Sequence, residues 1–336
     1  MAAEDRAIVV GINRYPALLR DLEGPENDAR AFEEWLLSPT GGAVPKDHVR
    51  RILSSDFKKE SDPRRAQPTA EKLKDAIDEL HDLGTNNDGK AGQRLYIFMA
   101  GHGIAPKLRT AALLMANAAR GRTGHHIQGP PYADWFVEAG FFKEVVLFMD
   151  CCRENSRLTP LQPCHLDERK AREPARYFYG LATQFGKAAR ERPGEDTLKR
   201  GIFTTALLVG LRQGPRGGGN VTGSWLRGFV FNYMNKLVAG PEKPQKPKFD
   251  YDPDDDIVFL TLDPPIFPVR IRAGSSGQGR KVTIRNKDFD EVPHSAYSDG
   301  LWQWELGPGF YQYGYSGGPW YDLPLDGEVQ QYDVRL

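Results

Sequence analysis

The chain has 336 residues, and its 45 basic and 45 acidic side chains give a net charge of zero at neutral pH. Because a neutral chain has no overall electrostatic field that attracts nucleic acid or an anionic membrane, we expect neither as a partner. Hydrophobic residues make up 40% of the chain, enough for a packed core, and no apolar run reaches the roughly 18 residues that cross a bilayer. With three cysteines and no signal-peptide pattern, we expect a cytoplasmic protein without a disulfide framework.

The first two thirds of the chain alternate short apolar strands with amphipathic helices, which is typical of an α/β fold with a mostly parallel sheet. Strands are predicted at 6–12, 94–100, 144–149 and 177–183, and helices at 28–37, 69–83, 203–212 and 222–238. Gly84 is expected to end the second of these helices. The polar segment 153–176 is expected to be an exposed loop, and residues 186–200 form a second polar stretch.

The character of the sequence changes beyond residue 262. Apolar and polar residues alternate between Gly and Pro turns, as in VRIRA, LWQWEL and FYQYGYSG, which predicts a small antiparallel β-domain. We therefore expect two domains, 1–262 and 263–336. The aromatic residues of the second domain are expected mainly to fill its core.

Two of the predicted strands end in residues suited to chemistry. Functional groups of a parallel sheet gather at the carboxyl ends of its strands. RLYIFMA is followed by Gly101-His102-Gly103, and EVVLFM is followed by Asp150-Cys151-Cys152, with the second cysteine fifty positions after the histidine. A thiolate and a neighbouring imidazole make a nucleophile–base pair. The backbone amides of Gly103 and Cys152 are suited to hold an oxyanion.

Four motifs in order resemble the caspase and metacaspase clan of cysteine peptidases, including the known histidine-to-cysteine spacing. They are AIVVGINRYP with LEGPENDARAF, MAGHG, DCCRE and RGIFTTALLVGL, and the resemblance covers about residues 6–262. The resemblance implies a caspase-like sheet flanked by helices and endopeptidase activity on protein or peptide substrates. It makes Cys152 the nucleophile and His102 its partner, and it implies no cofactor.

The resemblance also bears on specificity. Asp28 and Asp150 match the acidic residues with which metacaspases receive a basic residue before the scissile bond, so cleavage after Arg or Lys is expected. Two departures from the pattern are Pro25, where metacaspases often have Cys, and Ala100, which replaces a Ser. Arg20 keeps an aspartate-specific alternative open, and a caspase-like scaffold that only binds is the non-enzymatic alternative.

The remaining sites carry smaller expectations. Many metacaspases bind calcium through aspartates, but the matching stretch offers Asn117, Gln128 and Gly129, so no metal is expected there. His125 and His126 are expected to be solvated, and a zinc cluster of Cys164 and His165 with the other cysteines fits no standard spacing. The loop 153–176, which includes Arg153 and Arg157, is the predicted self-processing site of a zymogen in a regulatory or cell-death cascade. The small β-domain is expected to receive an activating partner.

Overall fold

The computed structural model describes residues 2–18, 21–60, 62–119, 121–122, 124–155, 163–194, 196–237, 244–274, 280–326 and 329–336. These residues divide into two compact units. The first comprises Met1–Arg212 with Thr222–Leu260, and the second comprises Gln213–Val221 with Thr261–Leu336. The domain boundary after residue 262 stays a prediction.

The first unit is built on a six-stranded sheet with the strand order β13-β9-β7-β3-β1-β2. Its strands are β1 (Arg6–Gly11), β2 (Val49–Leu53), β3 (Arg94–Gly101), β7 (Glu144–Cys151), β9 (Arg176–Leu181) and β13 (Lys248–Tyr251). All neighbouring strands run parallel except β13, which is antiparallel to β9. The predicted α/β fold with a mostly parallel sheet is confirmed.

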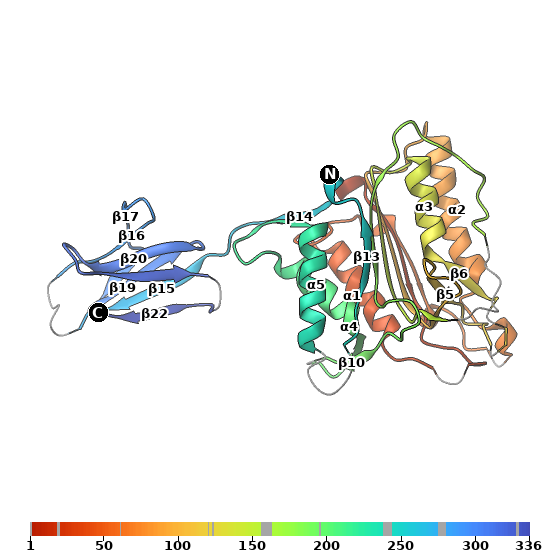
Figure 1. Ribbon diagram of the computed structural model, residues 1–336, viewed down its shortest axis with the longest axis horizontal. Helices are drawn as coiled ribbons and strands as arrows, with labels where there is room; N and C mark the ends of the chain where they lie inside the picture. The colour runs from red at the N-terminus through yellow and green to blue at the C-terminus, as the bar shows by residue number, and fades with distance from the viewer. Residues whose placement is uncertain are drawn as a thin grey trace. The chain divides into compact units, whose positions relative to one another are not determined.

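Helices cover both faces of this sheet, with α2 and α3 on one side and α1, α4 and α5 on the other (Figure 1). Their bounds are α1 (Pro25–Leu37), α2 (Ala70–Asn86), α3 (Gly129–Ala139), α4 (Ile202–Gln213) and α5 (Gly223–Leu237). Because both faces are covered, the central strands are continuous apolar runs rather than alternating ones. Every residue of β7 is buried.

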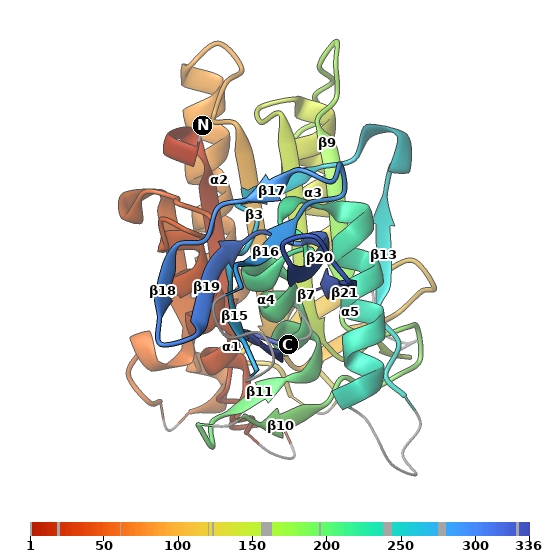
Figure 2. The same cartoon turned by 90° about the vertical axis from the view of Figure 1, so that its left-hand side faces the viewer.

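Two smaller sheets lie at the carboxyl ends of the strands of the main sheet. A four-stranded sheet has the order β6-β5-β4-β8, and β10 pairs with β11 in a hairpin at this end of the main sheet (Figure 2). The strands are β4 (Gly103–Ala105), β5 (Ala112–Leu114), β6 (His126–Gln128), β8 (Glu154–Asn155), β10 (Glu191–Pro193) and β11 (Lys199–Gly201). Short 3₁₀ helices span Ala2–Glu4, Lys46–His48, Ser54–Asp56, Pro63–Arg65 and Pro253–Asp255, and β12 (Gly219–Thr222) and β14 (Val258–Leu262) form a two-stranded sheet.

Three sequence-based expectations are wrong in detail. Gly84 does not end α2 but lies within it, and a Cβ there would stand 2.2 Å from the ring of Phe141, so this glycine serves packing rather than helix termination. His126 is not solvated: it belongs to β6 and is 1% exposed. Arg153 does not lie in an exposed loop but is 1% exposed, whereas residues 167–170 further along that segment are exposed as expected.

The second unit contains two four-stranded sheets, with the orders β18-β19-β15-β22 and β17-β16-β20-β21. The strands are β15 (Phe267–Arg272), β16 (Val282–Arg285), β17 (Glu291–Val292), β18 (Ala296–Ser298), β19 (Leu301–Leu306), β20 (Gly309–Tyr315), β21 (Trp320–Leu325) and β22 (Tyr332–Arg335). Apolar side chains from both sheets, Val269, Ile284 and Trp304 among them, form one core, which explains the alternating pattern. Among the described helices of the whole chain, none combines the length and the apolar character needed to cross a membrane.

Candidate active site

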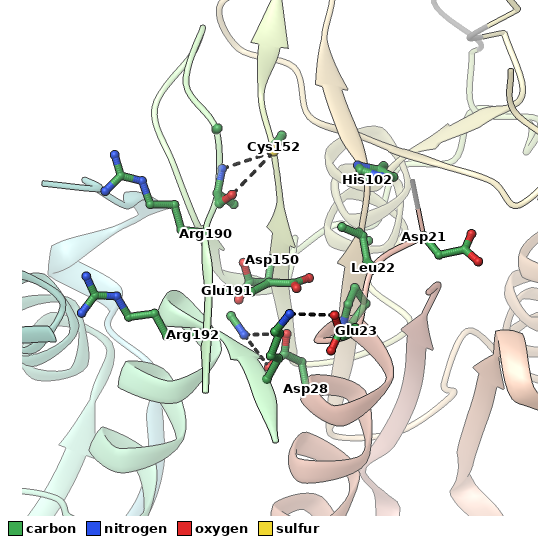
Figure 3. A pocket seen from close by; sticks show the side chains of 16 residues that line it. Asp21, Leu22, Glu23, Asp28, His102, Asp150, Cys152, Arg190, Glu191 and Arg192 are labelled. Carbon is green, nitrogen blue, oxygen red and sulfur yellow. Dashed lines mark hydrogen bonds and ion pairs between the residues drawn. The ribbon is translucent and has the colours of Figure 1, made fainter. Parts of the chain in front are cut away.

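The register of the central sheet brings His102 and Cys152 together. Strands β3 and β7 are parallel neighbours, and Gly101 pairs with Cys151 at their carboxyl ends. The next residue of each strand is His102 on one and Cys152 on the other, and adjacent strands lie about 4.8 Å apart. Both residues line the same pocket, where Figure 3 shows them on either side of an opening.

The glycines beside the histidine permit this close approach. A Cβ on Gly103 would lie 2.5 Å from the carbonyl oxygen of Cys152 and 2.6 Å from the sulfur of Cys151. A Cβ on Gly101 would lie 2.4 Å from the hydroxyl of Tyr15. The Gly-His-Gly sequence is therefore needed where one strand end packs against its neighbour.

Tyr15 fixes the position of the histidine from the other side. Its hydroxyl accepts a hydrogen bond from the His102 backbone amide at 3.0 Å and donates one to the Leu114 carbonyl at 3.1 Å. The Tyr15 and His102 rings meet edge to face, with their centroids 4.7 Å apart. The tyrosine is 1% exposed, so its position is set by packing as well as by hydrogen bonds. The motif NRYP had matched the family pattern, but no role for Tyr15 followed from the sequence.

The two adjacent cysteines have different environments. Burial raises the pKa of the Cys151 thiol, which is 2% exposed and is held in its neutral form. Cys152 is partly exposed and lines the pocket. Its sulfur accepts a hydrogen bond from the Ala189 amide at 3.3 Å and lies 3.8 Å from the Ala189 carbonyl. Only Cys152 is placed to meet a ligand.

The pocket has a volume of about 670 Å³, and three carboxylates gather below the cysteine and histidine (Figure 3). Asp28 comes from the first turn of α1, Asp150 from the end of β7, and Glu191 from the start of β10. Asp28 is 2% and Asp150 is 6% exposed. Glu191 was not singled out from the sequence, because it lies in a polar stretch with no motif around it.

Groups at the end of β11 and at the start of α4 hold the two aspartates in place. Both oxygens of Asp28 accept from the Gly201 amide, at 2.9 and 3.0 Å. Asp150 Oδ2 accepts from the Thr204 amide at 3.0 Å and from its hydroxyl at 2.7 Å. A Cβ on Gly201 would lie 2.0 Å from Asp150 Oδ2, so residue 201 must be glycine for these contacts to form. Asp28 and Asp150 are therefore held by residues that are far from them in the sequence.

The carboxylates disfavour one another's charge. Burial raises the pKa of Asp150 to about 6; the Thr204 hydrogen bonds act against this rise, and the charge of Glu191 adds to it. Burial and, after it, the charge of Asp150 raise the pKa of Asp28 well above its ordinary value, against the hydrogen bond from Gly201. A cation entering the pocket would remove this repulsion and favour the ionised form of both groups.

The basic residues Lys199, Arg190 and Arg192 also line the pocket. Lys199 forms an ion pair at 2.6 Å with Glu23, another residue of the pocket lining. The side chains of Arg190 and Arg192 extend away from the three carboxylates (Figure 3), and the Arg192 guanidinium donates to the Leu237 carbonyl. Arg20 and Arg157 lie outside the described residues.

The cysteine and histidine of the zinc alternative lie at a different place. His165 hydrogen-bonds to the Tyr132 hydroxyl at 2.9 Å and to Asp78 at 2.6 Å, on the side of the sheet covered by α2 and α3. All three cysteines are free thiols. Among the described residues, no three His, Cys, Asp or Glu side chains are grouped as metal ligands.

Comparison with known proteins agrees with this architecture. The model of the caspase domain matches residues 4–253. A protein named as a probable protease, from a Desulfuromonadales bacterium, is 30% identical over 215 residues, which are 61% of this chain and 26% of that protein. The chain thus spans about a quarter of the length of this curated relative.

A solved structure extends the comparison to the fold. The crystal structure of caspase-1 from Spodoptera frugiperda superposes with a TM-score of 0.51 at 14% identity, over 77% of this chain and 90% of that one. This likeness concerns the fold, and it bears out the caspase-like sheet and helices expected from the motifs. With a family model that matches most of the sequence, the chain belongs to the caspase-domain family.

Proposed function

We propose that the chain is a cysteine endopeptidase that cleaves polypeptides after Arg or Lys. The observation that carries this proposal is the grouping of Asp28, Asp150 and Glu191 in the pocket that also holds Cys152 and His102. Carboxylates in a buried setting bind guanidinium and ammonium groups through charge-assisted hydrogen bonds. The same setting repels an acidic side chain, which disfavours the aspartate-specific alternative.

In the proposed reaction the Cys152 thiolate attacks the carbonyl carbon of the residue held by the carboxylates. The resulting oxyanion accepts hydrogen bonds from the backbone amides of Gly103 and Cys152. His102 donates a proton to the leaving amine as the tetrahedral intermediate collapses to a thioester. Water then hydrolyses the thioester, and Cys152 is regenerated.

Ala189 lies against the nucleophile of this reaction. Its amide and carbonyl both contact the Cys152 sulfur, so a substrate competes with this segment for the nucleophile. This contact supports a zymogen-like resting state.

We further propose a cytoplasmic location and a role in a regulatory or cell-death cascade. We also propose self-processing within 153–176 and an activating partner that binds the small β-domain.

The test uses three fluorogenic peptides that end in Arg, Lys or Asp before the reporter group. Wild type and Cys152→Ala are assayed in parallel, with EDTA and with added calcium. We expect wild type to hydrolyse the Arg and Lys peptides at a rate that EDTA does not change. The Cys152→Ala variant should hydrolyse them at least about 10³-fold more slowly. Cleavage of the Asp peptide alone would contradict the proposed specificity, and equal rates in both proteins would contradict the nucleophile.

A further inference from the structure

A second cavity lies at the same end of the sheet, and Arg153, the residue that follows the nucleophile, is part of its lining. It has a volume of about 480 Å³ and is lined by residues from four segments: the β4–β5 connection, the residue after Cys152, the residues after β9, and the start of β13. Three of its seven lining residues, Arg109, Arg153 and Lys248, are cationic, and none is acidic. The amide side chain of Gln184 adds a neutral polar group to this lining.

Arg153 is a buried cation that is solvated by carbonyl groups. Its guanidinium donates to the Leu108 carbonyl at 2.8 Å, to the Thr110 carbonyl at 3.0 and 3.1 Å, and to the Thr183 carbonyl at 3.3 Å. Within the part of the chain that the structure describes, no carboxylate forms an ion pair with it. Four of its five N–H groups are accounted for by these contacts, which leaves one Nη1 hydrogen available.

A charge buried without a counter-charge is costly to the fold. Burial accordingly lowers the pKa of Arg153. Carbonyl oxygens offset this cost in part through their dipoles, but an anion would offset it more fully. The exposed Arg109 and the half-buried Lys248 supply two further positive charges to the lining of the cavity.

We propose that this cavity binds a small oxyanion, a phosphate or carboxylate group. Arg153, Arg109 and Lys248 supply its positive charges, and the side-chain amide of Gln184 donates a hydrogen bond to the anion. The remaining Nη1 hydrogen of Arg153 can donate one charge-assisted hydrogen bond to an oxygen of either oxyanion. The apolar surface of Phe185 beside these groups gives room for the body of a molecule that carries the anion.

The position of this site connects it to the nucleophile. The Arg153 amide donates to the Lys187 carbonyl at 2.9 Å, and its carbonyl accepts from the Gly186 amide at 2.7 Å. The same chain segment continues to Ala189, which contacts the Cys152 sulfur. An anion bound to Arg153 therefore stabilises the segment that covers the nucleophile.

The test measures thermal unfolding of the full chain in the Cys152→Ala background, so that its outcome does not depend on peptidase activity. Sodium phosphate and, in a second series, sodium acetate are compared with sodium chloride at equal ionic strength. A saturable rise in Tm is expected, of about 3 °C at ten times the dissociation constant, with at least one of the two anions.

The rise should be lost when Arg109→Gln and Lys248→Gln are combined, since both positions are exposed or half-buried and avoid disturbing the buried Arg153. The matched control combines Lys46→Gln and Arg65→Gln, which are exposed, outside the cavity and change the net charge equally. It should keep the rise. No rise with either anion, or an equal rise in both double variants, would overturn the oxyanion site without bearing on the proposed peptidase.

Discussion

Replacing Asp150 with asparagine is predicted to stabilise the fold of this protein while it weakens cleavage of basic substrates. The side chain is 6% exposed and accepts two hydrogen bonds from Thr204. Asparagine keeps an oxygen for those donors and carries no charge. What it removes is the cost of keeping a buried carboxylate ionised, a cost to which the charge of Glu191 adds.

The size of this cost follows from the pKa of the group. In the folded protein burial raises the pKa of Asp150 from 3.8 to about 6, so the folded state holds the proton more tightly than the unfolded state does. The wild type therefore loses stability as the pH rises from about 4 to 6, and the cost is fully present above 6. A rise of this size corresponds to about 3 kcal/mol. The variant avoids this cost.

The assay is urea unfolding of Cys152→Ala and of Cys152→Ala with Asp150→Asn, at pH 5 and pH 8. The asparagine variant should gain about 3 kcal/mol in unfolding free energy at pH 8 and roughly half of that at pH 5. In a Cys152-containing pair, kcat/KM for the Arg peptide should fall at least about tenfold. A variant that is less stable at both pH values would refute the reasoning that this carboxylate is held at a cost for binding.

Three further changes test how the site is built. Tyr15→Phe removes a hydroxyl that satisfies two buried backbone groups, and we expect a loss of about 1–3 kcal/mol in unfolding free energy together with a lower kcat. Gly103→Ala should reduce kcat at least about 100-fold, because its Cβ meets the backbone of the cysteine; Gly228→Ala, where a Cβ meets nothing within 4 Å, is the control and should leave kcat unchanged. Thr204→Val removes the hydroxyl that lowers the pKa of Asp150, so the acidic limb of kcat/KM against pH should move to higher pH; an unmoved limb would assign that limb to another group.

The fold was largely predictable because its signals are local. The continuous apolar runs of β3 and β7 are typical of strands covered on both faces, and the amphipathic pattern of α2 was read correctly along most of its length. The end of α2 was misplaced at Gly84 because that glycine accommodates the Phe141 ring. A contact with a residue nearly sixty positions away leaves no trace in the local pattern.

The candidate site was predictable only where its residues follow strands. His102 and Cys152 come after apolar runs, and the register of a parallel sheet then places them side by side. Glu191 belongs to a short hairpin that ends at Gly201, and Asp28 and Asp150 accept hydrogen bonds from Gly201 and from Thr204 just after it. Such a hairpin has neither length nor periodicity, so its acidic residue could not be assigned to the pocket beforehand.

Arg153 illustrates a second limit of sequence patterns. A basic residue followed by polar ones is normally exposed, but this one is enclosed by carbonyl groups from two connections, the one between β4 and β5 and the one after β9. Its burial depends on how those connections fold back over the strand ends. Only the three-dimensional arrangement identifies a cationic cavity beside the nucleophile.

The most direct test of the central claim is covalent labelling with a peptidyl chloromethyl ketone. A reagent that ends in Arg is compared with one that ends in Asp, on wild type, Cys152→Ala and Cys164→Ala, and the adduct is located by mass spectrometry of the digested protein. The account predicts that the Arg reagent alkylates Cys152, with loss of chloride, in wild type and Cys164→Ala, at least about tenfold faster than the Asp reagent. Labelling at Cys164, or equal rates with the two reagents, would contradict it.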